Sequence, residues 1–407
     1  MGGGWWDSRW HPAYALPQLI AFYEDYPEQA SRVVQWQTLA SLCLSRWLIP
    51  ADKGGPTNRA GWPISYSEAS WTGLLNTQTC TFETSVMELL PTSCRDALPV
   101  LADFDALPYP CAWQPSYAQR WPALQRARCF LGLGDGACAN VGSKCTTIDR
   151  IACTIGTSAA ARVVVPVTST TTTTVPSGLF LYRINRQYLL LGGALTDGGS
   201  VVAWIRELLN VQSDDEMEAC LAQVEKLLLE DYRMSATAQT TETHRNPARP
   251  LVMLPFLSGE RSTNYQTSAT GALVGLTRAT TRAHLVKACL EGVTLRLAAI
   301  THLLPPKAQI WVSGKALEVN TVWRQMVADC TGRVVILDAD TTEGSSRGVA
   351  CLVAASLSNG EITTESASPN LLETAPRLEA KAYWDRLVQA QESFIDAMRP
   401  IYAGQVS

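Results

Sequence analysis

A single carboxylate set among glycines is the first feature of this 407-residue sequence that could carry chemistry. Asp135 lies in the run LGLGDGACANVGS, where Gly132, Gly134 and Gly136 leave its surroundings open. A carboxylate that a substrate can approach in this way is suited to act as a general base, taking a proton from a hydroxyl group. The same residue could instead be the N-cap of a helix that begins at ACANVGS. The local sequence does not decide between these roles.

Three glycine-containing turns downstream of this acid could bind phosphate. They lie at Gly156-Thr157-Ser158, at Gly198-Gly199 and at Gly314. The first follows an apolar strand, the second precedes a helix, and the third joins a strand to a helix. Backbone N–H groups at such turns donate to anionic oxygens, and the hydroxyl groups of the first turn add further donors. Each turn alone is more typical of an ordinary tight turn; three in one region shift the balance toward a bound phosphate without deciding it.

The region after residue 148 alternates between strand and helix patterns, which predicts an α/β domain. The strand patterns are RIACTIGT, ARVVVPV, SGLFLYRI, QYLLLGGAL, QIWVSG and RVVILDAD. The helix patterns are GSVVAWIRELL, EMEACLAQVEKLLLEDY and EGSSRGVACLVAAS. One more helix is predicted from apolar residues at helical spacing, closed by Gly332. These residues are Val319, Val322, Trp323, Met326, Val327 and Cys330.

The first hundred residues are mostly helical in pattern. One helix is predicted over PQLIAFYEDYPE and another over QASRVVQWQTLASLCLSRWL, where Val33, Trp36, Leu39 and Cys43 recur near the helical period. Because the pattern changes near residue 148, we place a domain boundary there, with 1–147 in one domain and 148–407 in the other. The run Thr168–Thr174 is interpreted as a surface loop and SATAQTTETHRNPARP as a long loop or linker.

Composition excludes several classes of function. The net charge of −4 provides no basic field, which argues against nucleic-acid binding. No apolar run approaches the roughly 20 residues that a membrane helix needs, and the N-terminus lacks the layout of a signal peptide. The twelve cysteines are scattered without a C-x-x-C pair, and the four histidines fall at no zinc-ligand spacing. We therefore expect free thiols, no metal site built from these residues, and a cytoplasmic protein. Oligomeric state is not indicated.

The sequence resembles the FGGY family of carbohydrate kinases. Eight stretches occur in the family's order: SEASWTGLL, LGLGDGACANVGS, IACTIGTSAAARV, GALTDGGS, PFLSGERS, ATGALVGLT, KACLEGVTLRL and SGKALEVNTVWRQMVADCTG. The resemblance implies the ribonuclease-H-like, actin-like ATPase fold, in which two domains clasp a cleft. It implies that ATP lies mainly on the C-terminal domain and the sugar mainly on the N-terminal one. It also implies ATP and Mg²⁺ as cofactors and a small sugar, polyol or sugar acid as substrate.

The resemblance gives roles to the acid and to the first turn. Asp135 falls on the family's catalytic base, which takes the proton from the hydroxyl group that is phosphorylated. Gly156 and Thr157 fall on a phosphate-binding hairpin near the γ-phosphate.

The other two turns fall on positions around the nucleotide. Gly198 and Gly199 match the turn beside the nucleotide phosphates and ribose, where either glycine could be the contact. Gly314 and Asn320 match the turn and the helix start that enclose the adenosine. The pair Glu260-Arg261 and Glu291 also match, and an internal ion pair or cap explains these better than substrate contact.

One family motif has no counterpart in this sequence. Family members begin with a strand and an Asp-x-Gly-Thr hairpin, which grips phosphate and helps to hold magnesium; the nearest run here, Asp197–Ser200, belongs to the later turn. The resemblance thus implies an incomplete first domain, without most of the sugar-binding positions, whose helices expose apolar area. Two functions follow: an ATP-dependent kinase of a sugar, polyol or sugar acid, or an impaired remnant that binds nucleotide or a partner without phosphoryl transfer.

Overall fold

The computed structural model describes residues 14–404 except 50–61, 108–111, 168–174, 239–249, 340–343, 359 and 363–369. The predicted Thr168–Thr174 loop, most of the predicted linker before residue 250 and the N-terminal tryptophans lie outside the described residues.

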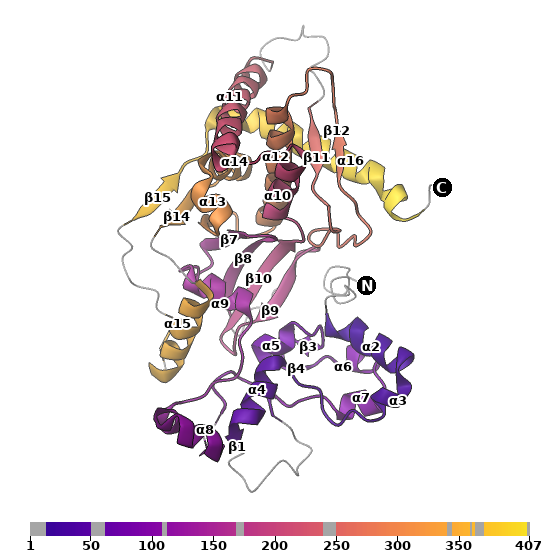
Figure 1. Ribbon diagram of the computed structural model, residues 1–407, viewed down its shortest axis with the longest axis vertical. Coiled ribbons are helices and arrows are strands. Elements are labelled where there is room, and N and C mark those ends of the chain that lie inside the picture. The colour runs from indigo at the N-terminus through magenta and orange to yellow at the C-terminus, as the bar shows by residue number, and fades with distance from the viewer. Residues whose placement is uncertain are drawn as a thin grey trace.

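A seven-stranded mixed sheet forms the centre of the C-terminal part (Figure 1). Its spatial order is β15 (Leu371–Thr374), β14 (Val335–Asp338), β13 (Gln309–Ser313), β7 (Arg150–Ile155), β8 (Ala159–Pro166), β10 (Tyr188–Leu195) and β9 (Phe180–Arg183). Strand β13 is parallel to both β7 and β14, and the other neighbours are antiparallel. Each of the six predicted strand patterns coincides with one of these strands, so those predictions are confirmed.

Helices cover one face of this sheet, above it in Figure 1. They are α10 (Gly199–Leu208), α11 (Asp214–Ala238), α12 (Arg282–His302), α13 (Lys315–Val319), α14 (Thr321–Thr331) and α16 (Lys381–Tyr402). Buried α12 lies directly on β10, where a Cβ added to Gly193 would come within 2.8 Å of Ile300 Cγ1. Helix α14 ends at Gly332, as predicted, with φ of 66°. The prediction is wrong for Val319, which belongs to α13 and is 70% exposed.

The other face carries α9 (Asp135–Gly142) and α15 (Gly344–Ser358), which lie together beside the sheet in Figure 1. Their backbones touch: a Cβ added to Gly348 would overlap the carbonyl oxygen of Cys138 in α9. Just past α9, the Lys144 ammonium pairs with the Asp338 carboxylate of β14 at 2.7 Å, and both side chains are 5% exposed. These contacts fix the middle and the C-terminal end of α9 to the part of the chain that follows residue 300.

The N-terminal part consists of short elements, grouped below β9 in Figure 1. The helices are α2 (Ala15–Asp25), α3 (Pro27–Ala30), α4 (Leu39–Trp47), α5 (Tyr66–Ser70), α6 (Thr84–Met87), α7 (Thr92–Asp96) and α8 (Pro115–Arg120), followed by a 3-10 turn, Pro122–Arg126. Three two-stranded sheets pair β1 (Leu48–Ile49) with β6 (Ala112–Trp113), β2 (Ile64–Ser65) with β5 (Leu101–Ala102), and β3 (Leu75–Asn76) with β4 (Thr81–Phe82).

The long helix predicted over residues 29–48 is wrong. Residues 33–38 are irregular, and a new helix, α4, starts after Thr38 because the Thr38 hydroxyl accepts a hydrogen bond from the Ser41 N–H at 3.2 Å. Such an N-cap satisfies a backbone donor that a continuous helix would have bonded internally. Apolar side chains of α4 are exposed, as expected: Leu39 is 78% and Leu42 is 39% exposed.

Strand β9 joins the N-terminal part to the sheet. The Tyr182 ring packs on Trp71 with centroids 4.3 Å apart, and its hydroxyl is 2.5 Å from that of Tyr14. Next along the strand, the Arg183 guanidinium donates to the carbonyl oxygens of Thr77 and Gln78. The junction is therefore built from aromatic stacking and buried hydrogen bonds.

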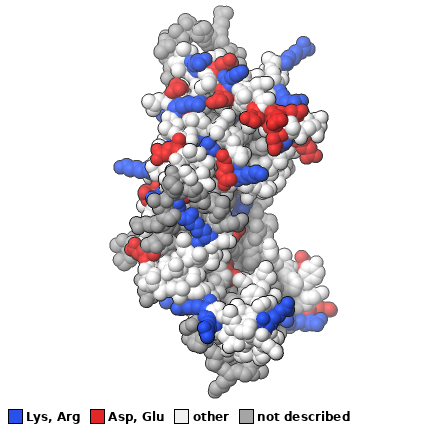
Figure 2. All heavy atoms as spheres, turned by 60° about the vertical axis from the view of Figure 1, so that its left-hand side comes forward, with Lys and Arg blue, Asp and Glu red and all other residues white. Residues whose placement is uncertain are grey.

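Some global features bear on function. Figure 2 shows Lys and Arg intermixed with Asp and Glu over the upper half of the molecule rather than gathered by sign. The cysteines within the described residues are free, and Cys153, Cys289 and Cys330 are buried. None of the helices in the described ranges combines the length and apolar composition that a membrane crossing requires.

The remaining elements of the fold are the small antiparallel pair β11 (Val252–Leu254) and β12 (Ala272–Val274) and a 3-10 turn at Leu378–Ala380, just before α16.

Candidate functional site

The first two glycine turns are bonded to one another. The Gly198 N–H donates to the Thr157 carbonyl at 2.9 Å, and the Gly199 N–H donates to the Gly156 carbonyl at 2.8 Å. Neither glycine has room for a side chain, since a Cβ on Gly198 would lie 2.7 Å from the Ser158 carbonyl carbon and one on Gly199 would lie 2.6 Å from the Gly156 oxygen. Segments 40 residues apart in sequence therefore form a single backbone surface at the end of β7 and β10.

The tip of the first turn offers unused donors. Residues 156–158 are exposed, and in the described part of the chain the N–H groups of Thr157 and Ser158 donate to no acceptor. Two free amides and two exposed hydroxyls suit the oxygens of a phosphate group. The residues of this turn thus fit the phosphate chain of a nucleotide.

The side chain of Asp197 stabilises the turn at Gly198-Gly199 through hydrogen bonds to the residues around it. Its buried carboxylate accepts hydrogen bonds from the Ser200 hydroxyl at 2.9 Å and from the Ser258 N–H at 2.7 Å. These bonds hold the turn at the start of α10 against the segment that follows β11. Because its oxygens are engaged in this way, Asp197 serves to position Gly198 and Gly199.

The third turn packs on the first. Gly314 ends β13 with φ of 96°, a conformation that L side chains rarely adopt, and a Cβ there would lie 2.6 Å from the Ile155 carbonyl oxygen. Next to it, the hydroxyls of Ser313 and Thr154 are 2.9 Å apart across β13 and β7. The structure therefore brings together all three glycine turns that the sequence singled out.

Gly314→Ala is expected to destabilise this junction and to weaken nucleotide binding. The backbone angle alone costs about 1–3 kcal/mol for a residue with a Cβ, and the close Ile155 oxygen adds a steric term. We expect MgADP affinity to fall about tenfold, equivalent to roughly 1.4 kcal/mol, measured by titration calorimetry. The matched control is Gly332→Ala, which also has positive φ but no heavy atom within 4 Å of its Cβ position. Equal loss of affinity in both variants would contradict the assignment.

Asn320 lies one short helix, α13, beyond Gly314. Its side-chain oxygen accepts a hydrogen bond from the Trp323 N–H at 2.9 Å and caps α14. That bond engages the carboxamide oxygen, so the amide nitrogen is the group that Asn320 would present to an adenosine.

Asp135 is the first residue of α9, and its side chain is exposed. The alternative that Asp135 is the N-cap is wrong, because that position belongs to Gly134, and Asp135 Oδ1 accepts a hydrogen bond from the Gly136 N–H at 2.7 Å. The preceding segment is tied to the N-terminal part: the Ser67 hydroxyl accepts from the Gly134 N–H at 3.0 Å, and the Ser65 hydroxyl donates to the Gly132 carbonyl. The acid thus lies where the N-terminal part meets α9, open to a ligand.

Arg162 is the site residue that the sequence reasoning missed. It lies on β8, and a Cβ added to Gly136 would be 3.3 Å from its Cζ atom, which places the guanidinium at the start of α9 beside Asp135. Burial lowers the pKa of Arg162, and the Asp135 carboxylate opposes that shift. Burial, with a smaller contribution from the same carboxylate, raises the pKa of the Cys138 thiol to about 11. A charged residue inside the apolar run AAARVVVP was the signal that could have revealed it.

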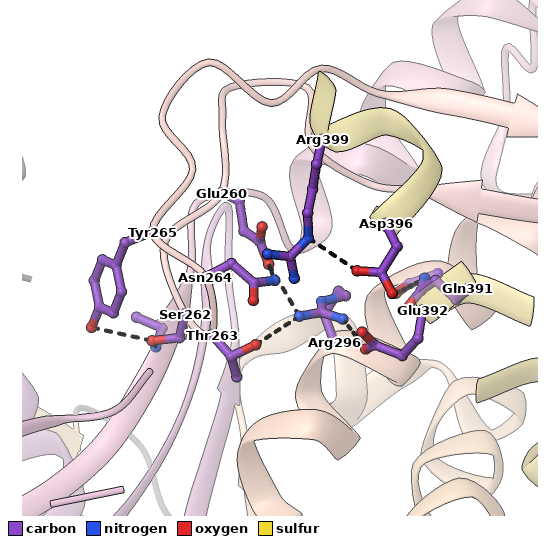
Figure 3. Close-up of polar contacts among 12 residues, drawn as sticks. Glu260, Ser262, Thr263, Asn264, Tyr265, Arg296, Gln391, Glu392, Asp396 and Arg399 are labelled. Carbon is purple, nitrogen blue, oxygen red and sulfur yellow. Dashed lines mark hydrogen bonds and ion pairs between the residues drawn. The ribbon is translucent and has the colours of Figure 1, made fainter. Parts of the chain in front are cut away.

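The matching acidic residues Glu260 and Glu291 form internal ion pairs, as the sequence suggested. Figure 3 shows the Arg296 guanidinium between Glu260, at 3.0 Å, and Glu392, at 2.6 Å, with a further bond to the Thr263 hydroxyl. Burial raises the pKa of Glu260, and Arg296 opposes the shift. The partner of Glu260 is therefore Arg296 of α12 rather than the adjacent Arg261.

Glu291 lies in a second buried cluster. Its carboxylate pairs with Lys287 at 2.8 Å and accepts a hydrogen bond from the Tyr383 hydroxyl at 2.6 Å. These contacts join α12 to α16 within the helical layer. Both glutamates stabilise the scaffold.

A magnesium ion would depend on the nucleotide for most of its ligands. Within the described ranges there is no group of three or more His, Cys, Asp or Glu residues that could hold a metal. Magnesium needs few protein oxygens where phosphate oxygens supply the others.

The chain belongs to the FGGY family of carbohydrate kinases. Residues 151–357, just over half of the chain, match the family's C-terminal domain. This match confirms the family resemblance, and six of the eight sequence stretches lie within the matched residues.

Two relatives of known function illustrate the range of the similarity. The gluconokinase of Bacillus licheniformis is 28% identical over 348 residues, which cover 84% of this chain and 62% of that protein. The xylulose kinase of Klebsiella pneumoniae is 35% identical over 158 residues, covering 38% of this chain and 30% of that protein. The chain thus spans about three fifths of the length of the gluconokinase.

Solved structures define the fold. The gluconate kinase from Lactobacillus acidophilus superposes with a TM-score of 0.74 at 22% identity, covering 98% of this chain and 74% of that one. A ligand-bound xylulose kinase from the same organism gives 0.75 with the same identity and coverage. The chain therefore has the α/β, ribonuclease-H-like (actin-like ATPase) fold that the resemblance implied.

Proposed function

We propose that this protein transfers the γ-phosphoryl group of ATP to a hydroxyl group of a small sugar, polyol or sugar acid. The main observation behind the proposal is that the three glycine turns contact one another. Among the described residues, the N–H groups of Thr157 and Ser158 on these turns have no acceptor and can bind phosphate oxygens. Membership of a carbohydrate kinase family supports it. In this proposal, residues 1–147 form the partial sugar-binding domain and residues 148–407 the nucleotide-binding domain, in the cytoplasm.

Each part of the site has a separate task in this reaction. Thr157 and Ser158 bind and orient the terminal phosphate, and Gly198, Gly199 and Gly314 let the backbone approach the nucleotide. Asp135 takes the proton from the acceptor hydroxyl as its oxygen forms a bond to the γ-phosphorus and the bond between that phosphorus and the oxygen of the leaving ADP breaks. Phosphoryl transfer depends mainly on positioning and charge neutralisation, to which Mg²⁺ bound with ATP contributes when present.

A second candidate is a protein that binds nucleotide or a partner without phosphoryl transfer. This alternative is retained because the hairpin motif Asp-x-Gly-Thr, which the family resemblance implies for gripping phosphate, does not occur in this sequence.

A direct assay separates the two functions. We expect the purified chain to consume ATP only when an acceptor is present, in a coupled assay with gluconate, xylulose, ribulose and glycerol. Measurable MgADP binding with no turnover of any acceptor would overturn the kinase proposal in favour of the binding protein. Turnover that Asp135→Asn does not reduce would contradict the assignment of Asp135 as the base.

A further inference from the structure

We propose that Arg162 and Arg261 form an anion-binding subsite beside Asp135, and that this subsite selects an acceptor carrying a carboxylate, a sugar acid. The inference rests on the proposed kinase function, because it assigns the acceptor side of the same site. Neither guanidinium forms a hydrogen bond or ion pair with any residue that the structure describes. Two cations at one site without protein partners call for a ligand.

The geometry of Arg162 is set by two glycines. A Cβ on Gly192 of β10 would lie 2.9 Å from Arg162 Cγ, so the aliphatic stem passes over that glycine. The guanidinium lies against Gly136 in the first turn of α9. Its Nε atom is buried there without a hydrogen-bond partner. A larger residue at either glycine would displace the arginine from Asp135.

The backbone of Arg261 is held close to Arg162 by hydrogen bonds between the next residue, Ser262, and Ala194 of β10. The Ser262 N–H donates to the Ala194 carbonyl at 3.0 Å, and the Ser262 hydroxyl accepts from the Ala194 N–H at 3.1 Å. This clamp fixes the chain on β10 two residues from Gly192, which supports Arg162. The Arg261 charge acts on Arg162, whose pKa it lowers further.

Among the charged groups that act on Arg162, Arg261 is a cation and Asp135 an acid, and neither is hydrogen-bonded to its guanidinium in the described part of the chain. The two guanidinium groups carry two positive charges, and Asp135 supplies one negative charge. Removing a cation from water is costly unless it is paired and hydrogen-bonded. A carboxylate provides both, because its two oxygens match the parallel N–H groups of a guanidinium.

The position of Arg162 favours the acceptor over the nucleotide. It lies four residues beyond Ser158 along β8, about 13 Å at the rise of an extended strand. Trp71 of the N-terminal part packs on Tyr182 of β9 with ring centroids 4.3 Å apart, and its indole nitrogen lies against Gly134, which precedes Asp135. The guanidinium is therefore on the side of Asp135 where the sugar-binding domain is proposed.

Equilibrium binding tests this without requiring turnover. Titration calorimetry would measure gluconate, xylonate and the neutral alditols glucitol and xylitol, each with MgADP present, on the wild type, Arg162→Met, Arg162→Lys and Arg261→Met. We expect the wild type to bind the acids at least tenfold more tightly than the alditols. Arg162→Met and Arg261→Met should each remove most of that preference, and Arg162→Lys should retain part of it. Arg278→Met, at an exposed arginine, is the matched control and should change nothing.

Four results would overturn the subsite. They are no binding of either acid by the wild type, equal affinity for acids and alditols, an acid preference that survives in both methionine variants, and a loss of MgADP affinity in Arg162→Met with acid binding unchanged. The last would assign the guanidinium to the nucleotide phosphates. Acid preference in a wild type that shows no ATP turnover would support the subsite while contradicting the kinase function, so the two failures are distinguishable. Thermal unfolding of each variant identifies loss of fold, and Arg261→Met, at a partly exposed position, is the independent second variant.

Discussion

Asp135→Asn should lower phosphoryl transfer by about 10²- to 10⁴-fold, the usual contribution of a general base. Asparagine keeps the shape and can still accept the Gly136 hydrogen bond, but it cannot take a proton from the acceptor hydroxyl. Since the nucleotide turns lie on other elements, the affinity for MgADP should stay within twofold. Steady-state rates with a saturating acceptor and calorimetric MgADP titration measure the two quantities.

Asp149→Asn is the matched control for this variant. Asp149 is also exposed and lies just before β7. The substitution Asp149→Asn therefore makes the same change from carboxylate to carboxamide at a position outside α9. Its rates should equal those of the wild type. A fall of less than tenfold in Asp135→Asn, or an equal fall in both variants, would remove the base assignment.

The second large effect is expected from Gly348→Ala, far from Asp135 in sequence. The new methyl group would overlap the Cys138 carbonyl oxygen, so α9 and α15 must separate. Overpacking of this kind costs about 1–3 kcal/mol of unfolding free energy. Because Asp135 begins α9, the shift also moves the acid, and a displacement of about 1 Å can cost on the order of 10²-fold in rate.

Urea unfolding and steady-state kinetics on the same samples test this coupling. Gly344→Ala is the control on the same helix, because its nearest heavy atoms would lie 3.8 Å away, in ordinary contact. That variant should remain within about 0.5 kcal/mol of the wild type and keep its rate. Similar losses in the two variants would show that α9 and α15 tolerate separation.

Local patterns in the sequence were sufficient to predict six of the seven strands of the sheet, but not β15 or the residue at which α4 starts. Apolar strands such as Arg150–Ile155 and Tyr188–Leu195 are buried, so their composition identifies them. The predicted helix over 29–48 failed because helical spacing of Val33 and Trp36 did not outweigh the capping hydroxyl of Thr38. Apolar spacing alone cannot show where a helix begins.

The site was predicted as separate pieces whose contacts the sequence could not reveal. Each glycine turn was visible, yet the bonds that join Gly156 to Gly199 link segments whose proximity only the folded sheet provides. Arg162 was overlooked because its role depends on the absence of side chains at Gly136 and Gly192, on two other elements. Close contact between segments that are distant in the sequence produces no recognisable pattern in the residues around either segment.

The Lys144–Asp338 pair has a consequence for biosynthesis. The ribosome completes the acid-bearing helix almost two hundred residues before it adds the counter-ion Asp338 and the packing partner α15. Until then the lysine must stay hydrated, since burying it alone would be prohibitively costly. Helix α9, which carries the proposed base, therefore reaches its final packed position only late in synthesis. In a nascent polypeptide that stops before residue 338, Asp135 would be present but the contacts that fix its position would be missing.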